Sequence, residues 1–321
     1  MDDSAAALGT NKGNLLDRLA QVRELPAIIF LLMSLVILSA VAPNFGSSTN
    51  LLSIARETAI VGIMGVGMTL VILTGGIDLS VASILALSAA VSATLMMRGT
   101  STLVSTFVGL CTGCACGFAN ALLITVLRVP PIITTLGTMG ILRAAVTLYT
   151  GAHSIGPLPS SFDIVGTGPI SALLLALTAA AATFFVSRLS VGRYVLAIGS
   201  NEEAVRLSGI DVDKVKILVY TLNGLLAAVA GMVVASSVNS AQSNTALGYE
   251  LNVIAAVVMG GTSISGGQGS IPGTVVGAAI MSVMSSALIL LGASVHWHKL
   301  IVGGVILTAV LIDKFRTTHK Q

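Results

Sequence analysis

Two clusters of side chains in this sequence have the types and spacing of a metal site. Cys111, Cys114 and Cys116 are spaced like a fragment of one, but a fourth soft ligand is missing and cysteine packs well in an apolar helix. His296 and His298 stand two positions apart, where they either chelate a metal ion or belong to an ordinary loop. We favour packing and an ordinary loop, so we expect no metal site. Disulfides are not expected, because three cysteines on one helix have no partners elsewhere.

A glycine-rich run at 260–269 comes nearest to a nucleotide-binding loop. It reads GGTSISGGQG and lacks the Lys-Ser or Lys-Thr ending with which a P-loop holds phosphates. Neither a His-Glu-x-x-His pair nor a nucleophile elbow occurs in the sequence. We therefore expect no enzymatic activity and no cofactor bound by this chain. Any ATP that serves it must be hydrolysed by a partner.

Apolar helices are the elements that would position a site. Of the 321 residues, 55% are hydrophobic and 9% charged, and the mean hydropathy of +0.97 excludes a soluble globular protein. A helix needs roughly 20 mostly apolar residues to cross a bilayer. We expect an all-α, polytopic membrane bundle of about ten transmembrane helices, at 25–42, 54–73, 79–97, 101–127, 131–149, 169–187, 217–235, 251–263, 271–291 and 297–312. The first stretch is longer than the core of a signal peptide, so we expect it to be retained.

Charged residues gather in one segment, 188–216. The chain has 16 Lys and Arg and 13 Asp and Glu, and nine of these 29 residues fall there. Lys and Arg in short loops mark the cytoplasmic side. With an inside N-terminus, ten alternating spans leave three of them outside (Arg56, Arg98 and Lys299) and twelve inside: Lys12, Arg18, Arg23, Arg128, Arg188, Arg193, Arg206, Lys214, Lys216, Lys314, Arg316 and Lys320. We therefore expect a cytoplasmic tail at 1–24, one membrane domain at 25–312 with a cytoplasmic loop at 188–216, and a cytoplasmic tail at 313–321.

Polar side chains inside such a bundle indicate a pathway or contacts between helices. Asp78 lies between the second and third spans and either caps the third helix or serves a pathway at its cytoplasmic mouth. Arg143 has no acidic partner in its span, so we expect it to snorkel or to bind backbone carbonyls. Candidates for a translocation path, each of which could equally form an interhelical hydrogen bond, are Asp78, Ser80, Asn120, Thr134, Thr135, Asn223, Asn239, Gln242, Glu250 and Asn252. Because acidic groups are few, this set favours a small neutral solute over an ion-coupled carrier.

Five sequence blocks make the chain resemble the permease subunits of bacterial ATP-binding cassette importers for simple sugars, the ribose type in particular. This family includes ribose, xylose, arabinose and autoinducer-2 permeases. The resemblance runs from about Pro43 to the C-terminus. Its blocks are GMTLVIL to GIDLS at 67–80, GRY at 192–194, NEEA to RLSG at 201–209, GYEL at 248–251, and VMGGTS to GGQG at 258–269. The N-terminal tail and the loop at 150–168 depart from the ribose type.

This resemblance implies a second copy of the chain, a cytoplasmic ATPase that binds ATP and Mg, and a periplasmic sugar-binding protein. The permease would lie among the lipids of the bacterial inner membrane. The binding protein would dock near 43–53, 150–168 and 236–250. The segment from Asn201 to Gly209, with Glu202, Glu203 and Arg206, would be the coupling segment that docks into the ATPase.

ATP-driven uptake of a simple sugar, with ribose the first choice, is the function that these observations favour. One alternative is a self-sufficient secondary carrier or facilitator for a small neutral solute. Another is a membrane enzyme or scaffold, which would need a reactive cluster that we do not find. Nucleic acid is not an expected partner, because the net charge of +3 reflects the placement of loops.

Overall fold

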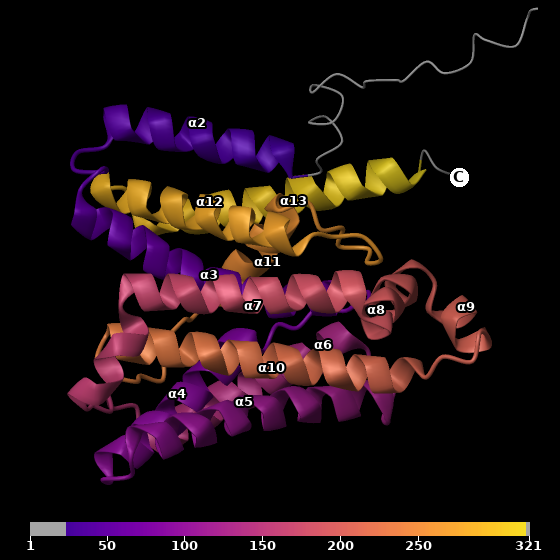
Figure 1. The fold of residues 1–321 in the computed structure, drawn as a ribbon, viewed down its shortest axis with the longest axis horizontal. Coiled ribbons are helices and arrows are strands. Elements are labelled where there is room, and N and C mark those ends of the chain that lie inside the picture. Colours follow the sequence, from indigo (N-terminus) through magenta and orange to yellow (C-terminus); the bar gives the residue numbers. More distant parts are fainter. Residues whose placement is uncertain (1–23, 319–321) are drawn as a thin grey trace, which may run out of the picture.

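Helices make up nearly all of the regular structure in the computed structural model, which describes residues 24–318 (Figure 1). In this range the chain forms α2 (Leu25–Val41), α3 (Ser48–Leu73), α4 (Val81–Met97), α5 (Thr102–Thr125), α6 (Pro131–Thr150), the 3₁₀ helix η1 (Ser160–Gly166), α7 (Gly168–Arg188), α8 (Ser190–Ser200), α9 (Glu202–Leu207), α10 (Val212–Ser237), α11 (Tyr249–Met259), α12 (Ile271–Leu290) and α13 (Val295–Thr318). One isolated β-bridge joins Ile155 and Ala241. Most of the expected N-terminal tail lies outside the described residues, whereas α13 extends into the expected C-terminal tail.

A helix occupies each of the ten ranges expected from hydropathy. Among the described residues, six helices are long and apolar enough to cross a membrane by length and composition: α3, α5, α6, α7, α10 and α12. Shorter apolar helices are α2, α4 and α11. The expectation of a multi-pass helical membrane protein is therefore confirmed.

The eighth expected span, 251–263, is wrong at its C-terminal end. Helix α11 has 11 residues and stops at Met259, because Gly260 ends the helix and Gly261 adopts a left-handed φ of 88°. Eleven residues rise about 16 Å, roughly half of a bilayer's hydrocarbon core. Hydropathy did not detect this end because the next four residues, Gly-Gly-Thr-Ser, carry no charge to mark it.

Side-chain caps fix where several of these helices begin. A serine, asparagine or aspartate directly before the helix accepts a hydrogen bond from a backbone N–H of the first turn. The capping residues are Ser47 before α3, Ser101 before α5, Asn201 before α9, Asp211 before α10 and Ser270 before α12. Proline supports the starts of α2, α6, α7 and α12, where its missing N–H costs no hydrogen bond.

The loops gather at two opposite ends of the bundle (Figure 1). At one end the backbone N–H of Gly267 donates to the carbonyl of Leu73 at 3.1 Å, and Arg128 meets Asp213. At the other end the bridge between Ile155 and Ala241 joins the loops that follow α6 and α10. Successive long helices therefore alternate in direction, as a multi-pass chain requires. Helices α8 and α9 lie at the first end.

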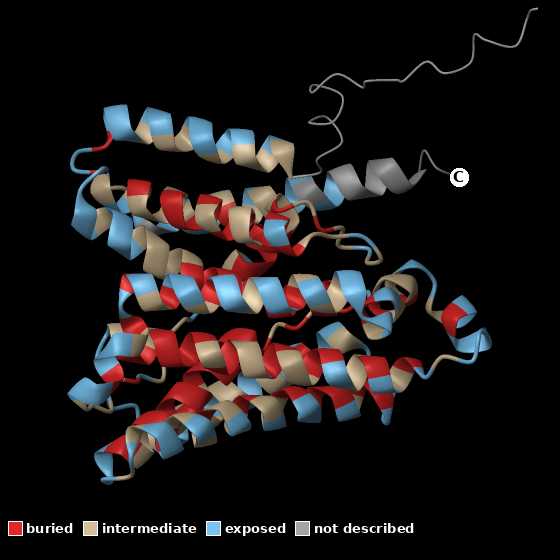
Figure 2. Cartoon of the chain, in the orientation of Figure 1, coloured by how far each residue is buried: buried red, intermediate tan, exposed pale blue. Residues whose placement is uncertain are grey.

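Helix α10 lies in the middle of the bundle, against α3, α4 and α5. Its contact with α5 is close because both helices carry glycine there: a Cβ on Gly117 would overlap the carbonyl oxygen of Tyr220, and one on Gly224 would overlap that of Gly113. Small residues allow helices to approach in this way inside a membrane. Buried residues line the inner faces, while α2, α6 and α7 expose apolar side chains outward (Figure 2).

Candidate functional site

The charged segment 188–216 folds into two short helices and the first turn of α10. Helix α8 turns Gly192, Val195 and Ile198 toward the bundle. The side chain of Asn201 accepts a hydrogen bond from the N–H of Ala204 at 3.0 Å and so starts α9. Gly209, with a φ of 81°, turns the chain back toward α10. The expected loop is therefore a structured projection at one end of the bundle (Figure 1).

Ion pairs hold α9 against α10. Glu202 pairs with Lys216 at 2.7 Å and with Arg206 at 3.2 Å. Asp213 accepts two hydrogen bonds of 2.7 Å from the guanidinium of Arg128 and lies 3.4 Å from Arg206. These five side chains form one chain of alternating charge across α9, α10 and the loop between α5 and α6.

The acidic members of this network stay ionised at neutral pH. Hydrogen bonds from Arg128 hold the pKa of Asp213 below its ordinary value, although partial burial opposes the shift. Partial burial raises the pKa of Glu202, but Lys216 and Arg206 outweigh it and the net shift is downward. A lowered carboxyl pKa stabilises the fold above the ordinary pKa, and this contribution is lost as the pH falls through the folded-state pKa. The network therefore persists through the neutral range.

One face of α9 remains free to meet another molecule. Val205 is buried and anchors the helix, whereas Leu207 is 83% exposed and Glu203 and Ala204 are also exposed. A large apolar side chain beside a carboxylate on a projecting helix suits a docking contact. The sequence predicted this segment and its residues Asn201, Glu202, Glu203, Arg206 and Gly209. The structure adds that Glu202 faces its own chain, whereas Glu203 faces outward.

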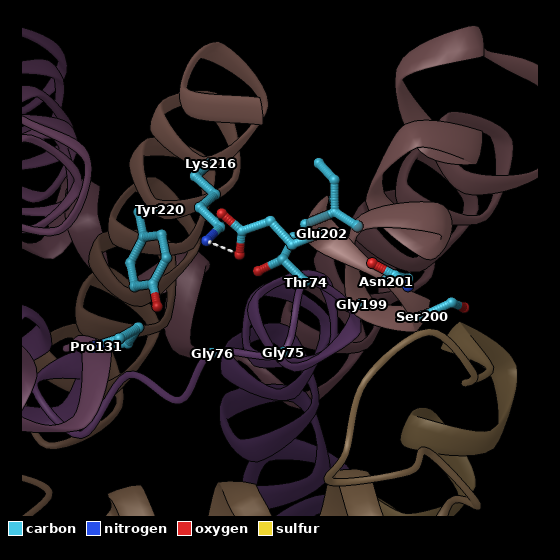
Figure 3. A pocket seen from close by; sticks show the side chains of 11 residues that line it. Thr74, Gly75, Gly76, Pro131, Gly199, Ser200, Asn201, Glu202, Lys216 and Tyr220 are labelled. Carbon is cyan, nitrogen blue, oxygen red and sulfur yellow. Dashed lines mark hydrogen bonds and ion pairs between the residues drawn. The ribbon is translucent and has the colours of Figure 1, made fainter. Parts of the chain in front are cut away.

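A pocket of about 330 Å³ lies where α9 joins the bundle (Figure 3). It is lined by Thr74, Gly75, Gly76, Pro131, Ile198, Gly199, Ser200, Asn201, Glu202, Lys216 and Tyr220. Tyr220 points from α10 toward Gly76, and its buried hydroxyl has no hydrogen-bond partner in the described structure. The pair formed by Glu202 and Lys216 lies across the pocket. The pocket thus connects the charged network with the break between α3 and α4.

A buried polar cluster surrounds Asp78 at this break. One carboxylate oxygen accepts hydrogen bonds from the N–H and the hydroxyl of Ser80 at 2.9 and 2.6 Å, and the other accepts one from Asn223 at 2.8 Å. Asn120 donates to the hydroxyl of Ser80 at 2.8 Å. All four residues are at most 1% exposed. The capping interpretation is therefore wrong: Ser80 is the N-cap of α4, which has no side-chain cap, and Asp78 binds Ser80 itself in the turn before the helix. Through Asn223, and through Ser80 with Asn120, Asp78 also ties this break to α10 and α5.

The remaining path candidates are spread over the bundle. Thr134 and Thr135 are buried near the first end, and Thr135 donates to the carbonyl of Ile77 at 3.1 Å. Asn239 lies at the other end, where its side-chain oxygen accepts from the N–H of Leu158 at 2.7 Å. Gln242 is exposed at that end, and Glu250 and Asn252 lie half-buried on α11. The candidates therefore form two separate groups, of which only the first surrounds Asp78.

Arg143 behaves as the sequence predicted. Its guanidinium donates to the backbone carbonyls of Ser243 and Thr245 at 2.8 and 2.9 Å. Of the two histidines, His298 has a ring nitrogen 3.3 Å from the side-chain oxygen of Asn252 on α11. The three cysteines are free thiols on α5.

Comparison with known proteins decides the family. The model of the family described as branched-chain amino acid transport system / permease component matches residues 50–310. The chain belongs to this permease family. The match includes both α9 and the cluster around Asp78. The ribose import permeases among its relatives confirm the resemblance expected from the five sequence blocks.

Individual relatives of this permease are similar over almost their full length. The ribose import permease protein of Escherichia coli K12 is 41% identical over 303 residues, covering 92% of this chain and 94% of the relative. The ribose import permease protein of Bacillus subtilis 168 is 40% identical, over 91% of this chain and 93% of the relative. The autoinducer 2 import system permease protein of Photorhabdus luminescens is 33% identical, over 91% of this chain and 89% of the relative. No solved structure gives a significant match.

Sequence reasoning missed the roles of Arg128, Lys216 and Tyr220. Arg128 appeared only as a charge that marks a side of the membrane, because its partner Asp213 lies 85 residues away in the chain. Lys216 likewise appeared only among the basic residues that mark the cytoplasmic side. Tyr220 lay within an apolar span and gave no signal. The spacing of Asp213, Lys216, Tyr220 and Asn223 along one helix face could have connected them.

Proposed function

We propose that this permease is the membrane subunit of an ATP-binding cassette importer that translocates a simple sugar, with ribose the first choice. The observation that carries the proposal is the 41% identity, over 92% of the chain, to a protein named ribose import permease. The Gly-rich run at 260–269 lacks the lysine of a P-loop, so ATP and Mg bind to a separate ATPase. The similarity to autoinducer 2 import permeases makes that compound the natural competitor in a specificity assay.

In this proposal the chain crosses the bacterial inner membrane ten times, with both termini in the cytoplasm. The end that carries α8 and α9 is cytoplasmic. Support comes from the distribution of basic residues: Arg128, Arg188, Arg193, Arg206, Lys214 and Lys216 belong to this end, against Arg56, Arg98 and Lys299 at the other. The half-length helix α11 and the break at Asp78 are irregular backbone inside the bundle, as found in transporters near their pathways.

Helix α9 is the coupling element of this proposal. Its exposed face, with Glu203 and Leu207, docks into the ATPase, and its ion pairs transmit the movement to the bundle. Two copies of the chain form the pathway by alternating access. A periplasmic binding protein delivers the sugar to the outer loops near 43–53, 150–168 and 236–250, beside the candidates Asn239, Gln242 and Glu250.

Affinity purification from native membranes tests the proposal. We expect a P-loop ATPase to copurify with the permease, and its ATP hydrolysis to rise when the sugar-loaded binding protein is added. A permease that purifies without an ATPase, and that equilibrates sugar across vesicles in the absence of ATP, is instead a self-sufficient carrier or facilitator.

A further inference from the structure

Four polar residues of α10 form a stripe that runs from the projecting end into the core. Asp213, Lys216, Tyr220 and Asn223 follow one another at spacings of three and four residues, which places them on one face of the helix. The side chain of Asp213 is 27% exposed and that of Lys216 is 14% exposed, whereas Tyr220 and Asn223 are buried. The two outer members contact α9, and the two inner members lie beside the break between α3 and α4.

The outer half of the stripe fastens α9. Lys216 pairs with Glu202, and Asp213 pairs with Arg206. Two charged side chains of α9 therefore form ion pairs with α10. Asp213 also accepts the two hydrogen bonds from Arg128, which follows α5 and holds a left-handed φ of 58°. Helix α9 is therefore attached to α10, and α10 to the end of α5.

The inner half of the stripe fastens the break between α3 and α4. Asn223 donates to the carboxylate of Asp78, which binds Ser80 at the start of α4. Asn120, on α5, donates to the same serine. Helices α5 and α10 are thus joined through polar contacts at two levels, by Arg128 with Asp213 and by Asn120 through Ser80 and Asp78 to Asn223.

Next to the inner level, the backbones of α5 and α10 are in close contact at their glycines. A Cβ on Gly113 would overlap the carbonyl of Gly224, and one on Gly117 would overlap that of Tyr220. Interfaces packed this closely shift as rigid bodies and do not deform continuously.

We propose that α5 and α10 form a single lever that carries movement of α9 to the break at Asp78, and that Arg128 and Asp213 are the positioning residues that hold α9 on this lever. The inference rests on the proposed coupling role of α9. It assigns to Arg128 a role in energy coupling that does not require contact with sugar or nucleotide.

Charge reversal tests the two positioning residues. We compare Arg128→Asp, Asp213→Arg and the charge-conserving Arg128→Lys in the full importer reconstituted with its ATPase and binding protein. Reversal of an exposed neighbour, Lys214→Glu, is the matched control, since Lys214 is 83% exposed and Asp211 keeps its cap on α10. Exposed ion pairs add little to folding stability, so all variants are expected to insert and fold.

The expected readout is sugar imported per ATP hydrolysed. Each single exchange should lower this ratio about fivefold or more, the low end of typical coupling between sites, while the ATPase remains bound. Arg128→Lys keeps a cation against Asp213 and should retain most of the ratio, and the Lys214 control should leave it unchanged. Single exchanges with normal coupling, or an Arg128→Lys variant as defective as they are, would overturn the lever.

A second measurement separates this inference from the proposed function. Amide hydrogen exchange at 202–207 is followed in the permease alone, in lipid nanodiscs. Faster exchange in both charge-reversed variants, with normal exchange in Arg128→Lys, supports the attachment of α9 through Arg128 and Asp213. Unchanged exchange contradicts it. Failure of the wild-type importer to couple uptake to ATP refutes the proposed function instead.

Discussion

Asp78 is the residue whose surroundings say most about how this bundle works. Its carboxylate is fully buried and receives three hydrogen bonds, one of them from Asn223 on a distant helix. A buried charge is tolerated only when it is satisfied in this way. The nearby hydroxyl of Tyr220 has no partner in the described structure, so the two neighbours on α10 contribute unequally.

This inequality predicts opposite outcomes for two conservative changes on α10. Asn223→Leu removes a donor from a buried carboxylate and should destabilise the permease by about 1–3 kcal/mol. Tyr220→Phe removes a hydroxyl without a hydrogen bond and should leave stability unchanged or slightly higher. Thermal unfolding in detergent measures both. Equal losses in the two variants would show that packing, not hydrogen bonding to Asp78, dominates here.

At this scale the sequence predicted residue types better than partners. It predicted that Arg143 would either snorkel or bind backbone carbonyls, because no acid is available to it in its span, and the structure shows the second. The partners of Asp78 could not be predicted, since Asn223 lies 145 residues away and an asparagine in an apolar span has many potential neighbours. A single sequence contains no record of which helices touch.

Among the elements, α5 and α10 approach each other closely where both carry glycine. Gly117→Ala would force a Cβ against the carbonyl of Tyr220, whereas a Cβ on Gly137 of α6 meets nothing within 4 Å. Overpacking of this kind costs about 1–3 kcal/mol. We expect Gly117→Ala to lower the melting temperature and Gly137→Ala to leave it the same or raise it. Similar melting temperatures for the two variants would contradict the close contact.

Two neighbouring glutamates of α9 look equivalent in the sequence but have different surroundings: Glu202 is paired with Lys216, and Glu203 is exposed. Glu203→Lys reverses an exposed charge and should weaken retention of the ATPase without loosening α9. Glu202→Lys removes the partner of Lys216 and should speed amide exchange at 202–207. Pull-down and hydrogen exchange measure the two effects. If Glu203→Lys retains the ATPase as well as the wild type does, the docking face lies elsewhere.

Hydropathy predicted these elements well and their irregular ends poorly. Each expected apolar range contains a helix, because length and composition suffice to specify one. The end of α11 at Met259 depends on the conformation of Gly260 and Gly261, and the coupling segment was expected as a loop although it folds into α8 and α9. Both errors occur where glycine or a side-chain cap, not hydrophobicity, decides the backbone.

In the whole molecule, one end carries α9 and its ion pairs, and the opposite end carries the loop pair joined by Ile155 and Ala241. Family membership and this division support a permease that receives its solute at one face and its energy at the other. The orientation is the part of this account that basic residues alone support.

ATP-driven ribose uptake into proteoliposomes tests the central claim most directly. The permease, its ATPase and its binding protein are reconstituted so that the binding protein meets the outer face and ATP the face that carries α9. We predict accumulation of ribose above its external concentration that requires both ATP and the binding protein, with autoinducer 2 a weak competitor. Ribose that equilibrates without ATP, or no flux with all partners present, would contradict the account.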